Sequence, residues 1–203
     1  MRWTSSGSYY PEDIRRATAA EIGRQVEVTH RVHGWVGLTD AKWIEILFRG
    51  GFAQVGRLQF ELMHDEYRVD YGLNTHISAV GHLDLDAVRD SFTRGRELFA
   101  RAFPEYGPIT LAGCNSWLLD PQFGELLPDS NIARFGRMWE PEDSGPGDGE
   151  VLFFVFDVPR GLGDRLHAIR PRLTARTRLQ KVVLEHWDAG GHFRTHRGFH
   201  WIA

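Results

Sequence analysis

The amino-acid sequence predicts an α/β protein of the α+β kind, in which helices flank a mixed sheet. Two segments with a period-two apolar pattern, residues 52–63 and 67–78, are separated by His64-Asp65-Glu66, which indicates a hairpin. The next segment, residues 84–103, repeats its apolar side chains at spacings of four and three, as an amphipathic helix does. A hairpin followed by a crossover helix favours a mixed sheet covered by helices.

Two helices are expected before this hairpin. Pro11 suits the first turn of a helix that continues to about His30, and the acidic residues after it favour the positive end of the helix dipole. Thr39 is a good N-cap for a second helix at 41–49, which Gly50-Gly51 ends.

The second half of the chain alternates shorter segments. Pro104 ends the helix that Asp84 begins. After it we expect a strand at 109–114, a short helix at 120–127, a strand at 131–139 and a loop at 140–149. An apolar central strand at 151–158, an irregular basic stretch at 160–176, a helix from 179 to about 189 and a last strand at 192–202 follow.

Length and charge exclude several classes of protein. The chain has 203 residues, which fits one domain, and its 24 Lys+Arg against 27 Asp+Glu offer no surplus for binding nucleic acid. No run of 18 apolar residues is present, so we expect no membrane partner. The single cysteine forms no internal disulfide, and the first residues show no signal-peptide pattern, so we expect a cytoplasmic protein.

Several motifs carry a resemblance to a known family. They are GRLQFE at 56–61, His76-Ile77 within NTHISAVGHLD, CNSWLLDP at 114–121, LPDSNI at 127–132 and TRLQ at 177–180. Together they resemble the GNAT-like C-terminal domain of bacterial acyltransferase-domain proteins, over about residues 43–200. The resemblance predicts a GNAT-like domain at 43–203 with a mostly antiparallel sheet, preceded by an N-terminal helical extension at 1–42.

The resemblance also implies an acyl-CoA site. In that fold, the strand ending at Ser78 and the strand at 109–114 diverge and open a groove for the pantetheine arm. The start of the helix after Asp84 receives the pyrophosphate, with Gly81 and His82 as cofactor-binding residues. The usual glycine-rich motif is missing here, and Asp84 as N-cap would compete with phosphate.

The two walls of this groove supply the candidate catalytic residues. His76 could act as a general base. Glu61 could orient His76 from the neighbouring strand, accept a substrate amine, or form an ordinary cross-strand pair. Cys114 could be a nucleophile or an inert buried thiol. Ser116 could donate a proton or act as a nucleophile, or cap the following turn.

Other polar side chains near the groove are candidate substrate-binding residues: Arg57, Asn74, Ser78, Asn115, Trp117 and Asn131. We expect no metal, because His192, His196 and His200 fall on a predicted strand, where a spacing of four residues separates them by about 13 Å.

Three functions follow from these observations. The first is transfer of an acyl group from CoA or a carrier protein to a small molecule. The second keeps the fold without CoA and performs hydrolysis, isomerisation or cyclisation on a small metabolite. The third is a non-catalytic interaction domain, with a homodimer as one possibility.

Overall fold

The computed structural model of the chain describes residues 10–48, 50–65 and 68–202. Its contacts divide the chain into two compact units, which are described separately: Met1–Thr29 with Val36–Cys114 and Phe199–Ala203, and His30–Trp35 with Asn115–Gly198. The predicted domain boundary between residues 42 and 43 stays a prediction. None of the described helices combines the length and the apolar composition that a membrane span requires.

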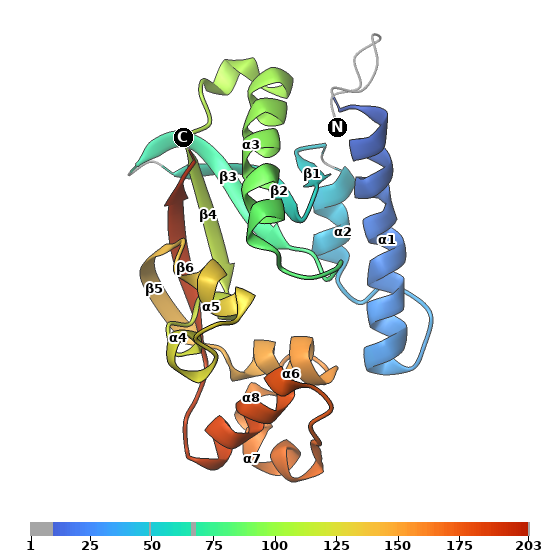
Figure 1. Cartoon of the computed structure of the whole chain (residues 1–203). Coiled ribbons are helices and arrows are strands. Elements are labelled where there is room, and N and C mark those ends of the chain that lie inside the picture. The colour runs from blue at the N-terminus through green and yellow to red at the C-terminus, as the bar shows by residue number, and fades with distance from the viewer. Residues whose placement is uncertain (1–9, 49, 66–67, 203) are drawn as a thin grey trace. The chain divides into compact units, whose positions relative to one another are not determined.

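The first unit contains the predicted hairpin and the helices around it (Figure 1). Its elements, some of which continue into the second unit, are α1 (Glu12–His33), α2 (Ala41–Phe48), β1 (Phe52–Val55), β2 (Leu58–Asp65), β3 (Val69–Ile77), α3 (Leu85–Ala102), η1 (Pro104–Tyr106), β4 (Leu111–Ser116) and β6 (Arg194–Trp201).

The described strands form one sheet in the order β1-β2-β3-β4-β6-β5, where β5 is Glu140–Pro146. β1 pairs antiparallel with β2, and β2 antiparallel with β3. β3 pairs parallel with β4, in a register that runs from Leu73 opposite Ala112 to Thr75 opposite Cys114. The mixed sheet flanked by helices that the sequence predicts is therefore confirmed.

Two sets of helices contact the two faces of β1, β2 and β3. On one face, Phe60 of β2 packs against Phe92 of α3 with ring centroids 5.7 Å apart. On the other face, Gln59 of β2 donates a hydrogen bond to Glu21 of α1, and Trp43 of α2 packs on Phe52 of β1. Because side chains alternate along a strand, the odd-numbered residues of β2 and their partners on β3 face α1 and α2.

Local sequence signals explain where these elements begin and end. Asp84 caps α3 as predicted, since its side chain accepts hydrogen bonds from the backbone N–H groups of Asp86 and Ala87. The strand predicted at 52–63 is two strands, because the chain turns at Gly56, whose φ of +58° suits glycine. The predicted hairpin turn at 64–66 begins inside β2, and Glu66 and Tyr67 lie outside the described residues.

The second unit is built from short elements around a separate apolar core. They are η2 (Trp117–Leu119), α4 (Phe123–Leu126), α5 (Asn131–Gly136), β5, α6 (Asp148–Phe156), η3 (Gly163–Arg165), α7 (Leu166–Ile169), η4 (Arg170–Arg172) and α8 (Arg178–Asp188). The core consists of buried apolar side chains: Trp117, Phe123, Leu127, Val151, Leu152, Val183, Leu184, Trp187 and Phe193.

Three predicted elements of this unit are wrong. The segment predicted as a strand at 131–139 contains helix α5, because Ser130 caps it by accepting a hydrogen bond from Ala133 N at 3.0 Å. The predicted loop at 140–149 contains the edge strand β5, whose polar residues are largely exposed. The predicted central strand at 151–158 falls largely within helix α6, since a short apolar run fits a buried helix as well as a buried strand.

Candidate functional site

A histidine, a glutamate and an asparagine meet on β2 and β3, on the face that α1 and α2 contact. His76 Nε2 lies 3.1 Å from Glu61 Oε1, and Asn74 Nδ2 donates to the same oxygen at 2.7 Å. The side chains of His76 and Glu61 are 25% and 23% exposed, so both are reached by solvent. The predicted pairing of Glu61 with His76 is therefore present in the structure.

The register of the hairpin creates this cluster. Glu61 lies opposite Asn74 and Gln59 lies opposite His76, so the four side chains share one face of the sheet. His76 comes one residue after Thr75, the last residue of β3 that pairs with β4, and β3 continues to Ile77. His76 consequently lies in the last part of β3, beyond the residues that pair with β4.

The electrostatics of the cluster favour a charged glutamate. Burial alone would raise the pKa of Glu61, but hydrogen bonds from His76 and Asn74 outweigh burial and lower the pKa below its ordinary value. An ionised carboxylate can only accept, so His76 donates from Nε2 and leaves Nδ1 unprotonated in its neutral form. Nδ1 is therefore the atom of His76 that can take up a proton.

Aromatic rings surround His76 on the same face. The ring of Trp43 from α2 lies edge to face with the imidazole, with centroids 4.7 Å apart at 80°. The ring of Phe52 lies 6.0 Å away. These contacts restrict the imidazole orientations to those that fit between the rings. The sequence places Trp43 within the predicted helix at 41–49, but nothing in the sequence ties that helix to β3.

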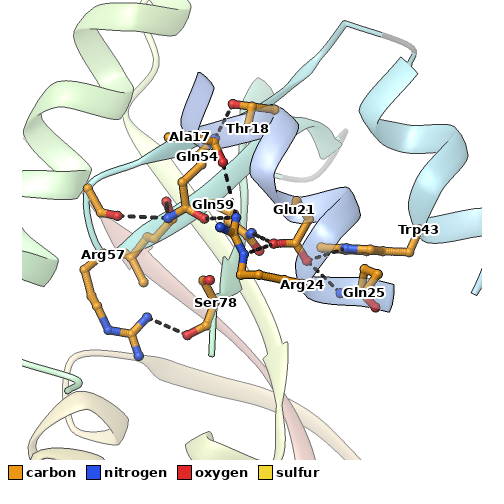
Figure 2. A network of polar contacts seen from close by, with 12 residues as sticks. Ala17, Thr18, Glu21, Arg24, Gln25, Trp43, Gln54, Arg57, Gln59 and Ser78 are labelled. Carbon is orange, nitrogen blue, oxygen red and sulfur yellow. Dashed lines mark hydrogen bonds and ion pairs between the residues drawn. The ribbon is translucent and has the colours of Figure 1, made fainter. Parts of the chain in front are cut away.

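The loop from Ser78 to Asp84 joins the end of β3 to α3. Arg57, from the turn before β2, donates to the carbonyl of Ser78 at 2.7 Å and to that of His82 at 2.8 Å. Figure 2 shows the first of these bonds. Burial lowers the pKa of the Arg57 guanidinium below its ordinary value. Arg57 thus fixes the loop that carries the predicted cofactor residues.

Two details of this loop bear on phosphate binding. Gly81 has a φ of +67°, which lets the loop turn, and the predicted cofactor residue His82 follows it. The Asp84 carboxylate accepts from two N–H groups at the start of α3, so a negative charge already occupies that helix end. The N-cap role of Asp84 that the sequence predicts is therefore present, and its competition with phosphate stays a prediction.

Cys114 lies in β4 and is buried, with 2% of its surface exposed. Burial raises the pKa of its thiol above the ordinary value, which keeps the sulfur protonated at neutral pH. A protonated, enclosed thiol is a poor nucleophile. The structure therefore favours the packing role of Cys114 over the catalytic one.

The remaining predicted site residues belong to the second unit. Ser116 caps η2 by accepting from Leu118 N at 3.1 Å, and Asn131 is the first residue of α5. Trp117 is buried in the core of that unit, whereas Asn115 is exposed. The capping contact of Ser116 is thus present, and the substrate-binding roles of Asn115, Trp117 and Asn131 stay predictions.

The second unit also contains a cavity of about 460 Å³. Asp148 on its wall accepts from Trp187 Nε1 at 2.7 Å, from Phe193 N at 2.9 Å and contacts His192 Nδ1 at 2.7 Å. Asp148 therefore links α6, α8 and the segment that leads into β6. Among the described residues, no group of three or more His, Cys, Asp or Glu side chains could hold a metal ion.

Comparison with known proteins identifies a family that the chain matches. The family model of the GNAT-like C-terminal domain matches residues 52–200. No curated protein sequence matches the chain.

Solved acyltransferases have a similar structure. One, in complex with CoA and 10C-teicoplanin, is 32% identical with a TM-score of 0.84, over 95% of this chain and 59% of its own. A second, in complex with decanoyl-CoA and teicoplanin, gives the same values. A third, in complex with decanoyl-CoA, is 36% identical with a TM-score of 0.81, over 94% of this chain and 58% of its own. The chain thus spans about three-fifths of the length of these proteins.

Proposed function

Because the chain belongs to the family of the GNAT-like C-terminal domain, we propose that it transfers an acyl group from an acyl-CoA to an amine or hydroxyl group of a small molecule. The observation that supports this proposal most directly is His76, held by Glu61 where β3 extends beyond its recorded pairing with β4. The likeness to acyltransferases solved with CoA and decanoyl-CoA supports the choice of donor.

His76 performs the proton transfer in this proposal. Its Nδ1 takes the proton of the acceptor amine or hydroxyl as that group attacks the acyl carbon. The C–S bond of the thioester then breaks, and the CoA thiolate leaves and takes up the proton from the imidazolium, since a histidine exchanges protons readily near neutral pH. Glu61 holds the Nε2 proton and stabilises the positive charge that develops on the imidazole. Asn74 keeps the Glu61 carboxylate in place and ionised.

The proposal assigns the arm of the acyl-CoA, which supplies an acyl group activated as a thioester, to the end of β3. The hydroxyl oxygen of Ser78 is buried, and no described group is hydrogen-bonded to it. Backbone groups of a strand edge beyond its last paired residue can bind an extended ligand as an added strand. Ser78, Ile77 and the loop fixed by Arg57 are therefore the proposed donor-binding residues.

The test measures donor binding and transfer separately. Acetyl-, octanoyl- and decanoyl-CoA are titrated while thermal unfolding is followed, since a ligand at 100 times its Kd adds about 2.7 kcal/mol to stability. Transfer is measured as release of free CoA thiol on addition of small amines, alcohols or teicoplanin, which the similar acyltransferases bind. Stabilisation together with acceptor-dependent thiol release is expected. If no acyl-CoA produced stabilisation or thiol release, the proposal would be wrong.

One observation favours a second candidate, a reaction without CoA. Asp84 places a carboxylate at the start of α3, where the fold would receive a pyrophosphate. The same His76 and Glu61 would then activate water for hydrolysis or move a proton in an isomerisation or cyclisation. An acyl-CoA titration without any effect, together with hydrolysis of a small activated ester, would favour this candidate, and acceptor-dependent release of CoA thiol would exclude it.

Two predictions from the sequence concern the setting of this reaction. A cytoplasmic location is tested by cell fractionation. A homodimer is tested by light scattering of the purified protein, with a mass of twice 23.2 kDa expected for the dimer.

A further inference from the structure

A buried glutamate on α1 connects that helix to both α2 and the sheet. Glu21 is only 4% exposed, yet its two carboxylate oxygens accept four hydrogen bonds from side chains. The donors are Gln25 Nε2 at 2.6 Å, Arg24 Nε at 2.7 Å, Gln59 Nε2 at 2.7 Å and Trp43 Nε1 at 3.0 Å. Figure 2 shows the carboxylate with these contacts on either side of it.

The indole of Trp43 is the link to His76. Its Nε1–H is bound by Glu21, and its ring lies 4.7 Å from the imidazole of His76. A tryptophan side chain turns about two bonds, so one hydrogen bond at the indole nitrogen and one packed face are enough to fix it. Glu21 therefore sets the orientation of the Trp43 ring, and His76 packs against the ring in that orientation.

A buried charge of this kind is costly for folding. A buried carboxylate paired with a guanidinium is often no more stabilising than apolar side chains of similar volume. Arg24 is itself bound to the carbonyl of Ala17 and to Gln54 Oε1 of β1, so both members of the ion pair have further polar partners. These bonds offset the cost of burial, and a bonded network beside a candidate proton-transfer group is suited to positioning that group.

We propose that Glu21 is a positioning residue for His76 and acts through the indole of Trp43. The inference rests on the proposed function, because it assigns Glu21 a part in the same reaction. The helix that the sequence predicts as an extension outside the GNAT-like domain then contributes to the working of that domain.

The variants used to test this proposal must leave the other groups that contact His76 unchanged. Glu61 and Asn74 contact it within the sheet, Trp43 contacts it from α2, and Phe52 from β1. Of these, Glu61 is the charged group in direct contact. Substitutions at Glu21 and Trp43 leave Glu61 and Asn74 unchanged. Glu21 also accepts from Gln59, which lies opposite His76, so the part played by the indole is read from Trp43→Phe.

The kinetic experiment compares Glu21→Ala, Trp43→Phe and the double variant with the wild-type chain. Trp43→Phe keeps an aromatic ring and removes the indole N–H. We expect kcat to fall about ten- to hundredfold in each single variant with little change in the donor KM, as expected for a small misplacement of a reacting group. The double variant should be no slower than the slower single variant, because both changes break one link.

Two further variants separate positioning from a purely structural role. Glu21→Gln keeps an oxygen that can accept from the indole, and we expect it to recover most of kcat. Glu27→Ala, at an exposed position of the same helix, is the matched control and should keep wild-type kcat. Additive losses in the double variant, or a Glu21→Gln variant as slow as Glu21→Ala, would overturn the inference.

A spectroscopic arm keeps the inference testable if no transfer is found. The ring NMR signals of His76, assigned by their loss in His76→Gln, should shift in Trp43→Phe and in Glu21→Ala and stay unshifted in Glu27→Ala. Unshifted signals in folded Trp43→Phe would refute the positioning role even where the wild-type chain transfers acyl groups. Shifted signals without any acyl transfer would leave the Glu21 link standing and refute the proposed function.

Discussion

His76 Nε2 and Glu61 Oε1 lie 3.1 Å apart on two neighbouring strands, and Asn74 donates to the same glutamate oxygen. The contact joins residues that are fifteen positions apart in the chain and become neighbours through the hairpin register. It holds the Nε2 edge of the imidazole against a carboxylate, on the face of the sheet that α1 and α2 contact.

Asn74→Leu should raise the pKa of Glu61. The substitution removes one of the two hydrogen bonds that hold the pKa of this carboxyl below its ordinary value, while burial continues to act in the opposite direction. The measurement is a pH titration of the Glu61 carboxyl carbon signal by NMR. An unchanged or lower pKa of Glu61 in the variant would contradict the assignment of Asn74.

Glu21→Gln should change how stability depends on pH. Burial raises the pKa of Glu21, but its hydrogen bonds and Arg24 lower it below the ordinary 4.5, so the folded chain prefers the ionised form. That contribution is present above pH 4.5 and is lost as the pH falls through the folded-state pKa. Chemical unfolding should therefore show the largest gap between wild type and variant above about pH 5, narrowing in acid. A gap that widens in acid would contradict this sign.

Cys114→Ala should keep the acyl-transfer rate of the wild-type chain. The thiol is buried in β4 and burial raises its pKa, so it offers no thiolate for catalysis. Because Cys114 is the single cysteine, alkylation by iodoacetamide can be counted as one mass addition, which should appear only after unfolding. Rapid alkylation of the native protein, or loss of transfer in the alanine variant, would restore the nucleophile hypothesis.

Gly95→Ala and Gly23→Ala should have opposite effects on stability. A Cβ at Gly95 in α3 would lie 2.6 Å from the Phe60 ring, and such overpacking costs about 1–3 kcal/mol, partly offset by about 1 kcal/mol of helix propensity. A Cβ at Gly23 in α1 meets no atom within 4 Å, so alanine there should stabilise by about 0.5–1 kcal/mol. Urea unfolding of both variants provides the comparison, and a stabilised Gly95→Ala would show that α3 does not pack on β2 as described.

The sequence was most informative where a signal is local. Asp84 as the cap of α3 and the pairing of Glu61 with His76 depend on neighbouring residues and on a single hairpin. The apolar run at 151–158 misled because its composition suits a buried helix and a buried strand equally, and only the contacts of α6 with its core decide between them. The polar stretch at 140–149 contains a strand because it pairs at the edge of a sheet, and the composition of the stretch does not indicate this pairing.

The parts of the site that the sequence could not provide come from helix packing. Trp43 and Glu21 are 33 and 55 positions before His76, and each lies on a helix whose placement depends on the whole unit. The sequence places both residues within predicted helices but does not indicate that they are connected. Only the hydrogen bond between them and the ring contact with His76 show what the two residues share.

The account is tested most directly by the single-turnover rate of acyl transfer in His76→Gln, measured with a saturating acyl-CoA and an accepted amine or alcohol. We expect the rate to fall by about 10²- to 10⁴-fold, as for loss of a general base, while the affinity for the acyl-CoA stays at the wild-type value. A variant that transfers the acyl group at the wild-type rate would contradict the role of His76 and with it the proposed chemistry.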